Sequence, residues 1–305
     1  MNSTQASSIL VAGSANLDFV VRAPHIPAPG ETVLGREFRT YPGGKGANQA
    51  VAAARAGGAV TALLAAFGED TFAAPIEASL RAAGVALHAV RFADTPTGTA
   101  FICVSDAAEN AITVAPGANA RLEPTHLPVL TGVSHLLLQL EIPLASVSAY
   151  AAAARTARVS VVLNAAPAQA LPAALLSSID LLIVNEGEFA ALTGSHGTLD
   201  ERLQQLPVPT VIVTLGERGC IAKTPAGRLQ QPGFAVQAVD TTAAGDTFCG
   251  VLVAALSRGE TLAGALRRAS AAAALACTRH GAQDSIPDAS AVDALLAASS
   301  STINP

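Results

Sequence analysis

Short apolar runs rich in β-branched residues alternate along this chain with longer, alanine-rich stretches. The apolar runs predict strands at residues 9–12, 61–66, 135–140, 159–163, 181–184 and 211–214. The alanine-rich stretches predict helices at residues 47–56, 75–83, 144–156, 187–192, 245–257 and 262–278. Several of the strands are continuous rather than alternating apolar runs, which is typical of parallel strands covered on both faces. The pattern therefore predicts an α/β fold, a three-layer αβα sandwich around a mostly parallel central sheet.

Two segments break this alternation. Residues 17–41 predict a strand, a Pro/Gly turn and a second strand, and residues 97–115 predict a hairpin. Together they can form a small sheet that projects from the main body and needs to pack against the body or a second subunit. Because the chain has no internal repeat and no low-complexity linker, we expect residues 1–305 to form a single domain with this appendage. A further strand-like run, at residues 234–239, leads into the segment DTTAAGDTFCG.

Composition narrows the functional classes. Half of the 305 residues are apolar, but no uninterrupted apolar span reaches the roughly 20 residues that a bilayer requires. The first residues, MNSTQASSILVAGS, lack the features of a secretion signal, and the four scattered cysteines argue against disulfides and zinc. A net charge of −5 without a basic run argues against nucleic acid as a partner. The sequence thus predicts a soluble, cytoplasmic protein that binds neither membrane nor nucleic acid.

Polar clusters follow several predicted strands, where open α/β sheets bind ligands. In GSANLD, an extended chain places Asn16 and Asp18 on one face, where an amide and a carboxylate can hydrogen-bond vicinal hydroxyls. A turn stabilised by these two side chains is the alternative. In PGGKGANQA, three glycines around Lys45 allow close approach of a ligand and place Asn48 on the first turn of a helix. A plain glycine-rich helix entry explains the glycines but not the lysine, and the sequence contains no Walker A pattern.

Three further clusters are less specific when each is taken alone. In NEGE, Asn185 and Glu188 have the spacing of a helix capping box, or else form a phosphate contact and an outer-shell partner for hydrated Mg²⁺. TLGERG, residues 214–219, is a Gly-x-x-Gly turn between two strands, which is a weak signal alone. Glu141 lies just past a predicted strand, in QLEIP, where an exposed carboxylate is most often only solvated.

The segment DTTAAGDTF has the clearest chemistry. Its small residues leave backbone N–H groups uncovered at a helix start, which forms an anion pocket for a phosphoryl group. A carboxylate beside that pocket, Asp246, repels phosphate unless it serves to take the proton from an attacking hydroxyl, as the base in phosphoryl transfer does. The alternative is that Asp246 only satisfies the helix dipole from the first turn.

The chain resembles the PfkB-type carbohydrate kinases, and within them it is most similar to the ribose kinases. The motifs that carry the resemblance occur in the family's order: AGSANLDFVV, PGGKGANQAVAAARAG, PTGTAFICV, VAPGAN, LLLQLEIP, LNAAPA, IVNEGEFAALTG, VTLGERG, VDTTAAGDTFCG and TRHGAQDSIP. They span about residues 9–287, and the signatures GGKGAN and DTxAAGD are specific in combination.

The resemblance implies ATP-dependent phosphorylation of D-ribose at the 5-hydroxyl. Asp246 would be the catalytic base, beside an anion hole formed by the backbone amides of Ala243, Ala244 and Gly245. The ribose pocket would be lined by Asn16, Asp18, Gly44, Lys45, Asn48, Glu141 and Asp246. The nucleotide and its Mg²⁺ would be held by Asn185, Glu188, Thr214, Gly216, Gly219, Gly245 and Ser270. At position 270 the family typically carries an amide or imidazole, so Ser270 departs from the pattern.

The resemblance also implies activation by a monovalent cation, usually K⁺. The matching positions, which act mostly through backbone carbonyls, are Asp240, Thr242, Ala276, Arg279, Gly281 and Ser285. The family's projecting sheet covers the sugar as a lid and usually forms the dimer interface, which implies a homodimer through residues 17–41 and 97–115. Two alternatives stay open: a related kinase for 2-deoxyribose, another sugar or a nucleoside, and a sugar-binding protein that has lost catalysis.

Overall fold

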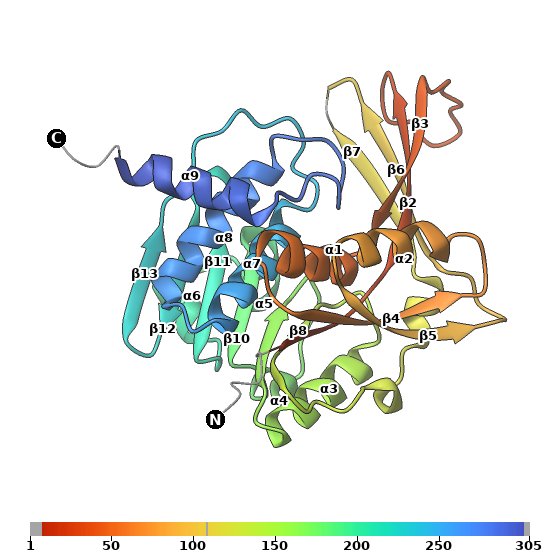
Figure 1. Ribbon diagram of the computed structural model, residues 1–305. Coiled ribbons are helices and arrows are strands. Elements are labelled where there is room, and N and C mark those ends of the chain that lie inside the picture. The colour runs from red at the N-terminus through yellow and green to blue at the C-terminus, as the bar shows by residue number, and fades with distance from the viewer. Residues whose placement is uncertain (1–7, 108, 302–305) are drawn as a thin grey trace.

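The structure of the chain, a computed structural model, describes residues 8–107 and 109–301, so residues 1–7, 108 and 302–305 of the expected domain lie outside it. Its centre is a nine-stranded sheet, which crosses the body of the molecule in Figure 1. The strand order is β13 (Gly227–Gln231), β12 (Cys220–Thr224), β11 (Thr210–Thr214), β10 (Leu181–Asn185), β9 (Ser160–Asn164), β8 (Val133–Leu138), β1 (Ser8–Ala12), β4 (Thr61–Gly68) and β5 (Ala86–Phe92). Only the pairs that include β12 are antiparallel, which confirms the predicted mostly parallel sheet.

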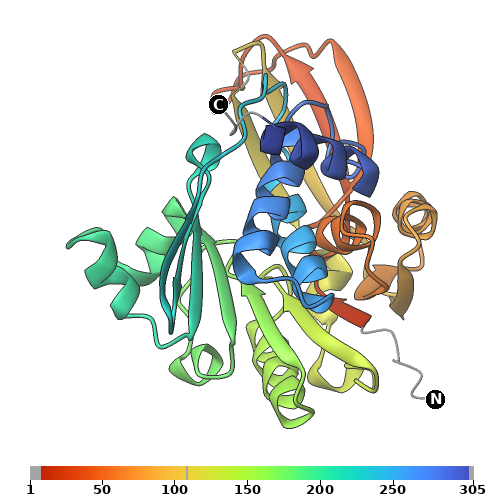
Figure 2. The same ribbon diagram turned by 60° about the vertical axis from the view of Figure 1, so that its left-hand side comes forward.

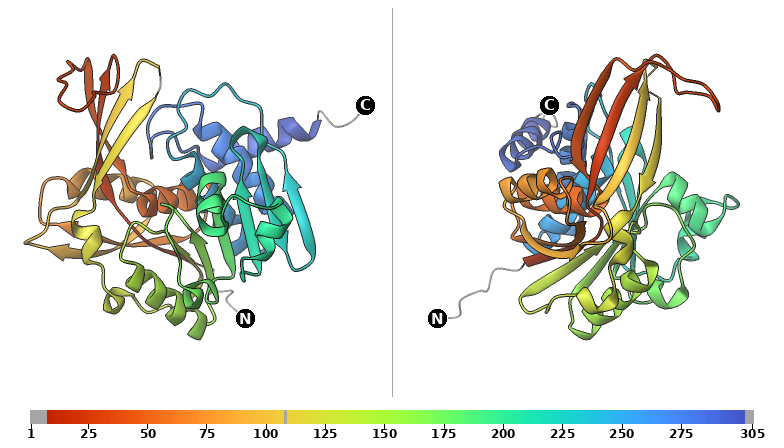
Figure 3. Two further views of the ribbon diagram at one scale, coloured as in Figure 1. Left: turned by 180° about the vertical axis from the view of Figure 1, so that it is seen from behind. Right: turned by 90° about the vertical axis from the view of Figure 1, so that its right-hand side faces the viewer.

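Helices cover both faces of this sheet. Successive residues of each strand point to opposite sides, so each strand contributes to two cores. Ile9 and Val11 lie in one core, and Leu10 and Ala12 lie in the other. The first core is covered by α1 (Lys45–Val51) with its π-helical continuation Ala52–Ala56, α2 (Ala73–Ala82), α7 (Ala244–Ser257), α8 (Leu262–Ala276) and α9 (Ala289–Ser301). The second is covered by α3 (Leu144–Thr156), α4 (Ala173–Leu176), α5 (Glu186–Thr193) and α6 (Leu199–Gln204). The right-hand view of Figure 3 shows both layers, so the three-layer sandwich is confirmed.

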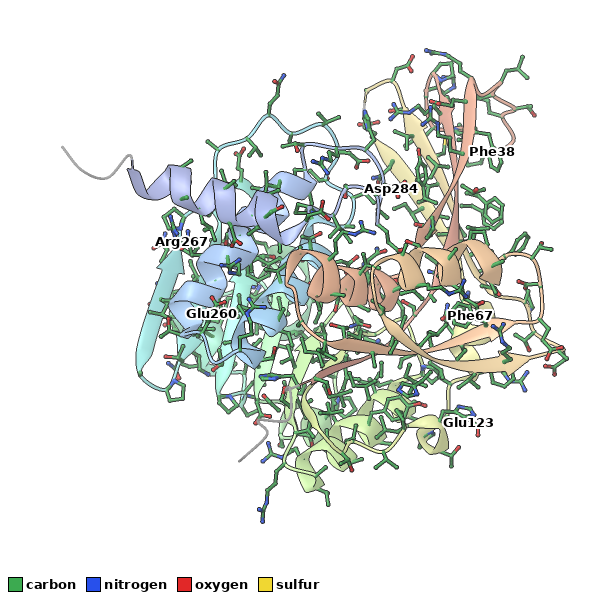
Figure 4. All side chains as sticks on the ribbon, in the orientation of Figure 1. Phe38, Phe67, Glu123, Glu260, Arg267 and Asp284 are labelled. Carbon is green, nitrogen blue, oxygen red and sulfur yellow. The ribbon has the colours of Figure 1, made fainter. Side chains whose placement is uncertain are left out.

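A smaller sheet projects from one end of the body, as Figures 1 and 2 show. Its strands follow in the order β3 (Glu37–Gly43), β2 (Asn16–Ala23), β6 (Gly98–Ser105) and β7 (Asn110–Ala115). On one of its faces the ring of Phe19 stacks between Phe38 and Phe101, and it meets Phe72 of the body edge-on at a centroid distance of 5.4 Å. Figure 4 marks Phe38 on this sheet. The aromatic contacts with Phe72 fasten the predicted appendage to the body.

Helices α1 and α7 pack very closely, and this packing positions the candidate site. Gly250 of α7 faces α1, where an added Cβ would lie 2.4 Å from the backbone oxygen of Gln49 and 2.7 Å from the Cβ of Ala52. Only a residue without a side chain permits this approach. The start of α7, which carries Asp246, is thereby held against the first turns of α1.

Some sequence predictions differ from the structure. Residues 234–239 are not a strand: they form an irregular segment in which the Val239 N–H donates to the carbonyl of Cys277, so the run pairs with a loop instead of a neighbouring strand. The predicted helix at 47–56 begins earlier, at Lys45, and its second half is π-helical. Strands β5 and β13 were not predicted, and β12 was implied only by the turn expected at residues 214–219. Within the described residues, no helix has the length and apolar character needed to cross a membrane.

Candidate functional site

Several of the predicted site residues meet at one edge of the central sheet. The chain leaves β1, β8 and β10 at this edge, as expected for the carboxyl ends of parallel strands. The glycine-rich start of α1 and the start of α7 face the same place, because α1 contacts both β1 and α7. The segments GSANLD, PGGKGANQA, QLE and AAGD, which are far apart in the sequence, therefore surround a common space.

Asp246 lies in the first turn of α7 with 9% of its surface exposed. Each carboxylate oxygen accepts a hydrogen bond from a side-chain amide of α1. Asn48 Nδ2 donates to Oδ2 over 3.0 Å, and Gln49 Nε2 donates to Oδ1 over 2.9 Å. A carboxylate oxygen has more than one lone pair, so this arrangement fixes the group and leaves it able to accept a proton.

The start of α7 is open to a ligand. Ala243 precedes the helix in the left-handed conformation, with φ of 58°, and no side chain caps the helix. A Cβ built on Gly245 meets no atom within 4 Å, so nothing covers the backbone there. The N–H of Ala244 donates to the carbonyl of Thr241, whereas among the described residues no hydrogen bond uses the N–H of Ala243 or Gly245. These two amides are available to an anion at the positive end of the helix dipole.

Lys45 and Glu141 form the polar wall opposite. The Lys45 ammonium lies 4.0 Å from Glu141 Oε1, and Glu141 Oε2 accepts the backbone N–H of Lys45 over 3.0 Å. The hydroxyl of Ser14, which is fully buried, donates to the same Oε2. The charge of Asp246, and less so that of Glu141, raises the pKa of Lys45 even though burial lowers it. The ammonium therefore stays charged, under the influence of the carboxylates of Asp246, Glu141 and Glu188.

Asn16 and Asp18 lie on the same face of β2, as their spacing predicted. Asn16 is buried, and its side-chain oxygen accepts a hydrogen bond from Asn119 over 2.7 Å. Burial, together with the charges of Glu141 and Asp246, raises the pKa of Asp18 to about 7. No hydrogen bond among the described residues reaches the Asp18 carboxyl, which therefore offers its oxygens to a ligand. Asn119, from the VAPGAN motif, was not predicted as part of this wall.

Further amides that were not predicted lie behind Asp246. Gln49, Gln139 and Asn164 are joined by hydrogen bonds and are all buried. They belong to the motifs GANQA, LLLQLEIP and LNAAPA, but no spacing between amides in the sequence reveals which of them meet. The one available signal is that each is a polar residue beside an apolar stretch that is expected to be buried.

The residues expected to hold a nucleotide lie at the ends of the neighbouring strands β10 and β11 and on the helices α5, α7 and α8. Asn185 and Glu188 form the predicted capping box at the start of α5, with both hydrogen bonds at 2.8 Å. Burial raises the pKa of Glu188, and the charge of Asp246 adds to this effect. The loop 214–219 follows β11 and leads into β12, so the predicted Gly-x-x-Gly turn between strands is present. Ser270 is buried on α8, where its hydroxyl lies beside the thiol of Cys220.

The segments expected to bind a monovalent cation lie against each other. The carboxylate of Asp240 accepts the backbone N–H of Thr242 over 2.9 Å and that of Gly281 over 3.0 Å. Burial acts to raise the pKa of Asp240, but these hydrogen bonds outweigh it and keep the pKa below its usual value. The predicted positions 276–285 form the end of α8 and the loop after it, which leads past Asp284 in Figure 4.

A cavity of about 420 Å³ separates the projecting sheet from these loops. Asp18 lies in its wall, together with Val20, Arg22 and Tyr41 of the sheet and His280 of the loop. Tyr41 is the sheet's contact with the loop, since a Cβ added at Gly281 would lie 3.5 Å from its ring. The cavity leads from the surface to the Asp18 end of the polar pocket.

The chain matches the model of the pfkB family carbohydrate kinases over residues 6–289. Among curated proteins, it is 40% identical to a ribokinase of Haemophilus influenzae, with 92% of this chain and 95% of that protein aligned. It is 36% identical to a ribokinase of Bacillus subtilis, with 95% and 99% aligned. Among solved structures, Arabidopsis thaliana ribokinase complexed with ribose and ATP superimposes with a TM-score of 0.88 at 34% identity, covering 95% of this chain and 99% of that one.

Proposed function

Because this chain belongs to the pfkB family of carbohydrate kinases, we propose that it transfers the γ-phosphoryl group of ATP to the 5-hydroxyl of D-ribose. The observation that carries the proposal is the position of Asp246. Its buried carboxylate lies directly beside the uncovered N-terminus of α7, so a base and an anion site adjoin each other. The similarity to ribokinases over nearly the whole chain supports ribose as the acceptor and ATP as the donor.

In the proposed reaction, the 5-hydroxyl oxygen attacks the γ-phosphorus as Asp246 takes its proton. The new oxygen–phosphorus bond forms while the bond between the γ-phosphorus and the β-γ bridging oxygen breaks, and ADP leaves with that electron pair. The backbone N–H groups of Ala243 and Gly245 stabilise the negative charge on the transferring group. Ala244 belongs to the same anion hole and joins it once its N–H leaves the carbonyl of Thr241.

The proposed ribose pocket comprises the start of α1, the first residues of β2 and the end of β8. Its residues can donate to and accept from the sugar hydroxyls, and they are Asn16, Asp18, Gly44, Lys45, Asn48 and Glu141. Four carboxylates, those of Asp18, Glu141, Glu188 and Asp246, act on the single ammonium of Lys45 or on one another. Such an excess of negative charge fits a site that also receives a divalent cation with its nucleotide.

We assign the nucleotide to the ends of β10 and β11 and to the facing parts of α7 and α8. The residues are Asn185, Thr214, Gly216, Gly219, Gly245 and Ser270, and Glu188 would orient water around Mg²⁺. Both oxygens of a carboxylate can accept two hydrogen bonds, so the capping bond from the Asn185 N–H leaves Glu188 able to do this. When bound, Mg²⁺ would neutralise charge on the phosphates.

The proposed site for K⁺ comprises Asp240, Thr242, Ala276, Arg279, Gly281 and Ser285. The lowered pKa of Asp240 keeps its carboxylate ionised, and its remaining lone pairs suit a cation ligand. A cation there would stabilise the loop that precedes α7, without being part of the bond-making step.

We also propose a homodimer in which the projecting sheets meet and cover the sugar. Two large aromatic side chains on one face of this sheet are exposed, with 63% of Phe38 and 54% of Phe101 accessible. Covering such residues with a second copy removes apolar surface from water.

All four cysteines, each within the described residues, are unpaired, which supports the predicted cytoplasmic location.

One assay tests the proposed function. Purified protein is given ATP, Mg²⁺ and either ribose, 2-deoxyribose, fructose or adenosine, and ADP formation is followed by a coupled assay. We expect ribose to have the highest kcat/KM, and Asp246→Asn to lower kcat by about 10²- to 10⁴-fold while calorimetric ribose binding persists. A higher kcat/KM for another acceptor would assign the enzyme to that substrate, and near-normal turnover of Asp246→Asn would refute the assignment of the base.

A further inference from the structure

The candidate base has a partner that the sugar cannot reach. Gln49 follows Asn48 in α1, and both amides donate to the Asp246 carboxylate. Asn48 keeps 6% of its surface exposed and belongs to the proposed ribose pocket, whereas Gln49 is fully buried. The contribution of Gln49 to the reaction must therefore pass through Asp246.

The surrounding hydrogen bonds determine which end of the Gln49 amide faces Asp246. Its Oε1 accepts from Gln139 Nε2 over 2.6 Å, and its Nε2 donates to Asn164 Oδ1 over 3.0 Å as well as to Asp246. Asn164 is oriented in turn, because its Nδ2 donates to the carbonyl of Ile183 over 3.3 Å. A reversed Gln49 amide would point its oxygen at the oxygens of Asp246 and Asn164, so the network excludes that orientation.

The anchors of this network belong to the rigid centre of the molecule. Gln139 directly follows β8, and Asn164 is the last residue of β9, so both are fixed by neighbouring parallel strands. The side chain of Gln139 also packs closely against Gly13, where an added Cβ would lie 1.9 Å from Gln139 Oε1. The central sheet thus sets the direction of the hydrogen bond that Asp246 receives, whereas the base belongs to a helix.

We propose that Gln49 is a positioning residue for phosphoryl transfer, which aims the Asp246 carboxylate at the sugar hydroxyl and is itself oriented by Gln139 and Asn164. This inference rests on the proposed role of Asp246 as the base. Without the bond from Gln49, only Asn48 holds the carboxylate, which can then rotate into orientations in which it cannot take the proton. Small misalignments of catalytic groups are costly because the reaction needs a near-attack geometry.

The test compares Gln49→Met with the wild type, since Met has similar length and no amide. We expect kcat with ribose to fall about 10- to 100-fold, because a hydrogen bond to a charged group is lost. The ribose KM and the calorimetric Kd should stay within about threefold, because Gln49 does not touch the sugar. A merely structural role predicts the opposite, in which ribose binding weakens in parallel with turnover.

The matched control is Ser146→Ala. Ser146 is also buried, and its hydroxyl donates to the carbonyl of Leu122 over 2.7 Å, but it lies on α3, which covers the opposite face of the sheet. It should lower the melting temperature without changing kcat. If Gln49→Met does not fold, Gln139→Met replaces it, and we expect a smaller fall in kcat with an unchanged KM because the Gln49 amide is then free to reverse.

Three outcomes would overturn the inference in an active enzyme: near-normal kcat in folded Gln49→Met, a parallel loss of ribose binding, or normal kcat in the substitute Gln139→Met. A wild-type protein that phosphorylates no acceptor would instead remove the proposed function, and the inference with it. The wild-type assay therefore separates the two failures before any variant is measured.

Discussion

Asp18 is the group for which the structure makes the sharpest quantitative prediction. Its carboxyl lies on β2 with 8% of its surface exposed, and no hydrogen bond among the described residues reaches it. Burial and the charges of Glu141 and Asp246 raise its pKa from 3.8 to about 7. Replacing Asp18 by Asn should therefore stabilise the ligand-free protein at pH 8 while it weakens ribose binding.

The magnitude follows from the shift in pKa. A raised pKa means that the folded protein binds a proton more readily than the unfolded chain, so ionisation costs stability as the pH rises from about 4 through 7. A shift of about three units, at about 1.4 kcal/mol per unit, gives a ceiling of about 4 kcal/mol at pH 8 and less than half of that at pH 5. The Asp18→Asn variant avoids this cost, and its advantage should grow over the same range.

Urea unfolding of both proteins at pH 5 and pH 8, without sugar, measures this difference. Asp200→Asn is the control, because Asp200 lies on the surface in an ion pair with Arg228 and should change the free energy of unfolding equally at both pH values. Calorimetry with ribose then checks the loss of binding. The reasoning would be refuted if Asp18→Asn were no more stable than the wild type at pH 8, or if its gain were the same at pH 5.

Three further outcomes are expected. Gly250→Ala should lower the free energy of unfolding by about 1–3 kcal/mol and also reduce kcat, since the new methyl group forces α7 away from α1. The control is Gly264→Ala, whose added Cβ would have its nearest neighbour 3.4 Å away and should cause neither change. Equal behaviour of the two variants would contradict the packing argument. Replacing K⁺ by a bulky organic cation should lower kcat in the wild type, and Asp240→Ala should abolish this response; a variant that still responds would exclude Asp240 as a ligand. ATP hydrolysis without sugar should be slow, because closure of the projecting sheet over ribose excludes water, and rapid hydrolysis in a phosphate-release assay would count against that closure.

The sequence predicted the parts of the fold whose local pattern and tertiary environment agree. The buried strands of the central sheet read as continuous apolar runs, and the helices carry enough alanine to be recognised. Strand β5 was not predicted because only one of its edges is paired and most of its residues are exposed or half-buried. Residues 234–239 have strand propensity but no neighbouring strand, so the loop around Cys277 accepts their hydrogen bonds instead.

In the candidate site, too, some residues could be predicted from the sequence and others depend on tertiary packing. The order of the motifs and their resemblance to a kinase family identified Asp246, Lys45 and the glycine-rich segments, because each of these features alone also has an ordinary structural role at a helix start. The amides of Gln49, Gln139 and Asn164 gave no such signal, since a lone Gln or Asn beside an apolar run has many ordinary roles. Their mutual contacts form where α1 packs on the ends of β8 and β9, and the contact of Gln49 with Asp246 depends on how closely α1 and α7 approach, which is set by Gly250.

The projecting sheet is joined to the central sheet by a short segment between β1 and β2. The chain passes from β1 to β2 through Gly13, Ser14 and Ala15 alone, and β2 itself carries Asn16 and Asp18. Any movement of the projecting sheet would therefore also tilt Asn16 and Asp18, two of the groups proposed to bind the pentose, whereas Glu141 follows β8 of the central sheet. Under the proposed function, binding of the pentose to Asp18 would thus be coupled directly to closure of the projecting sheet over the cavity.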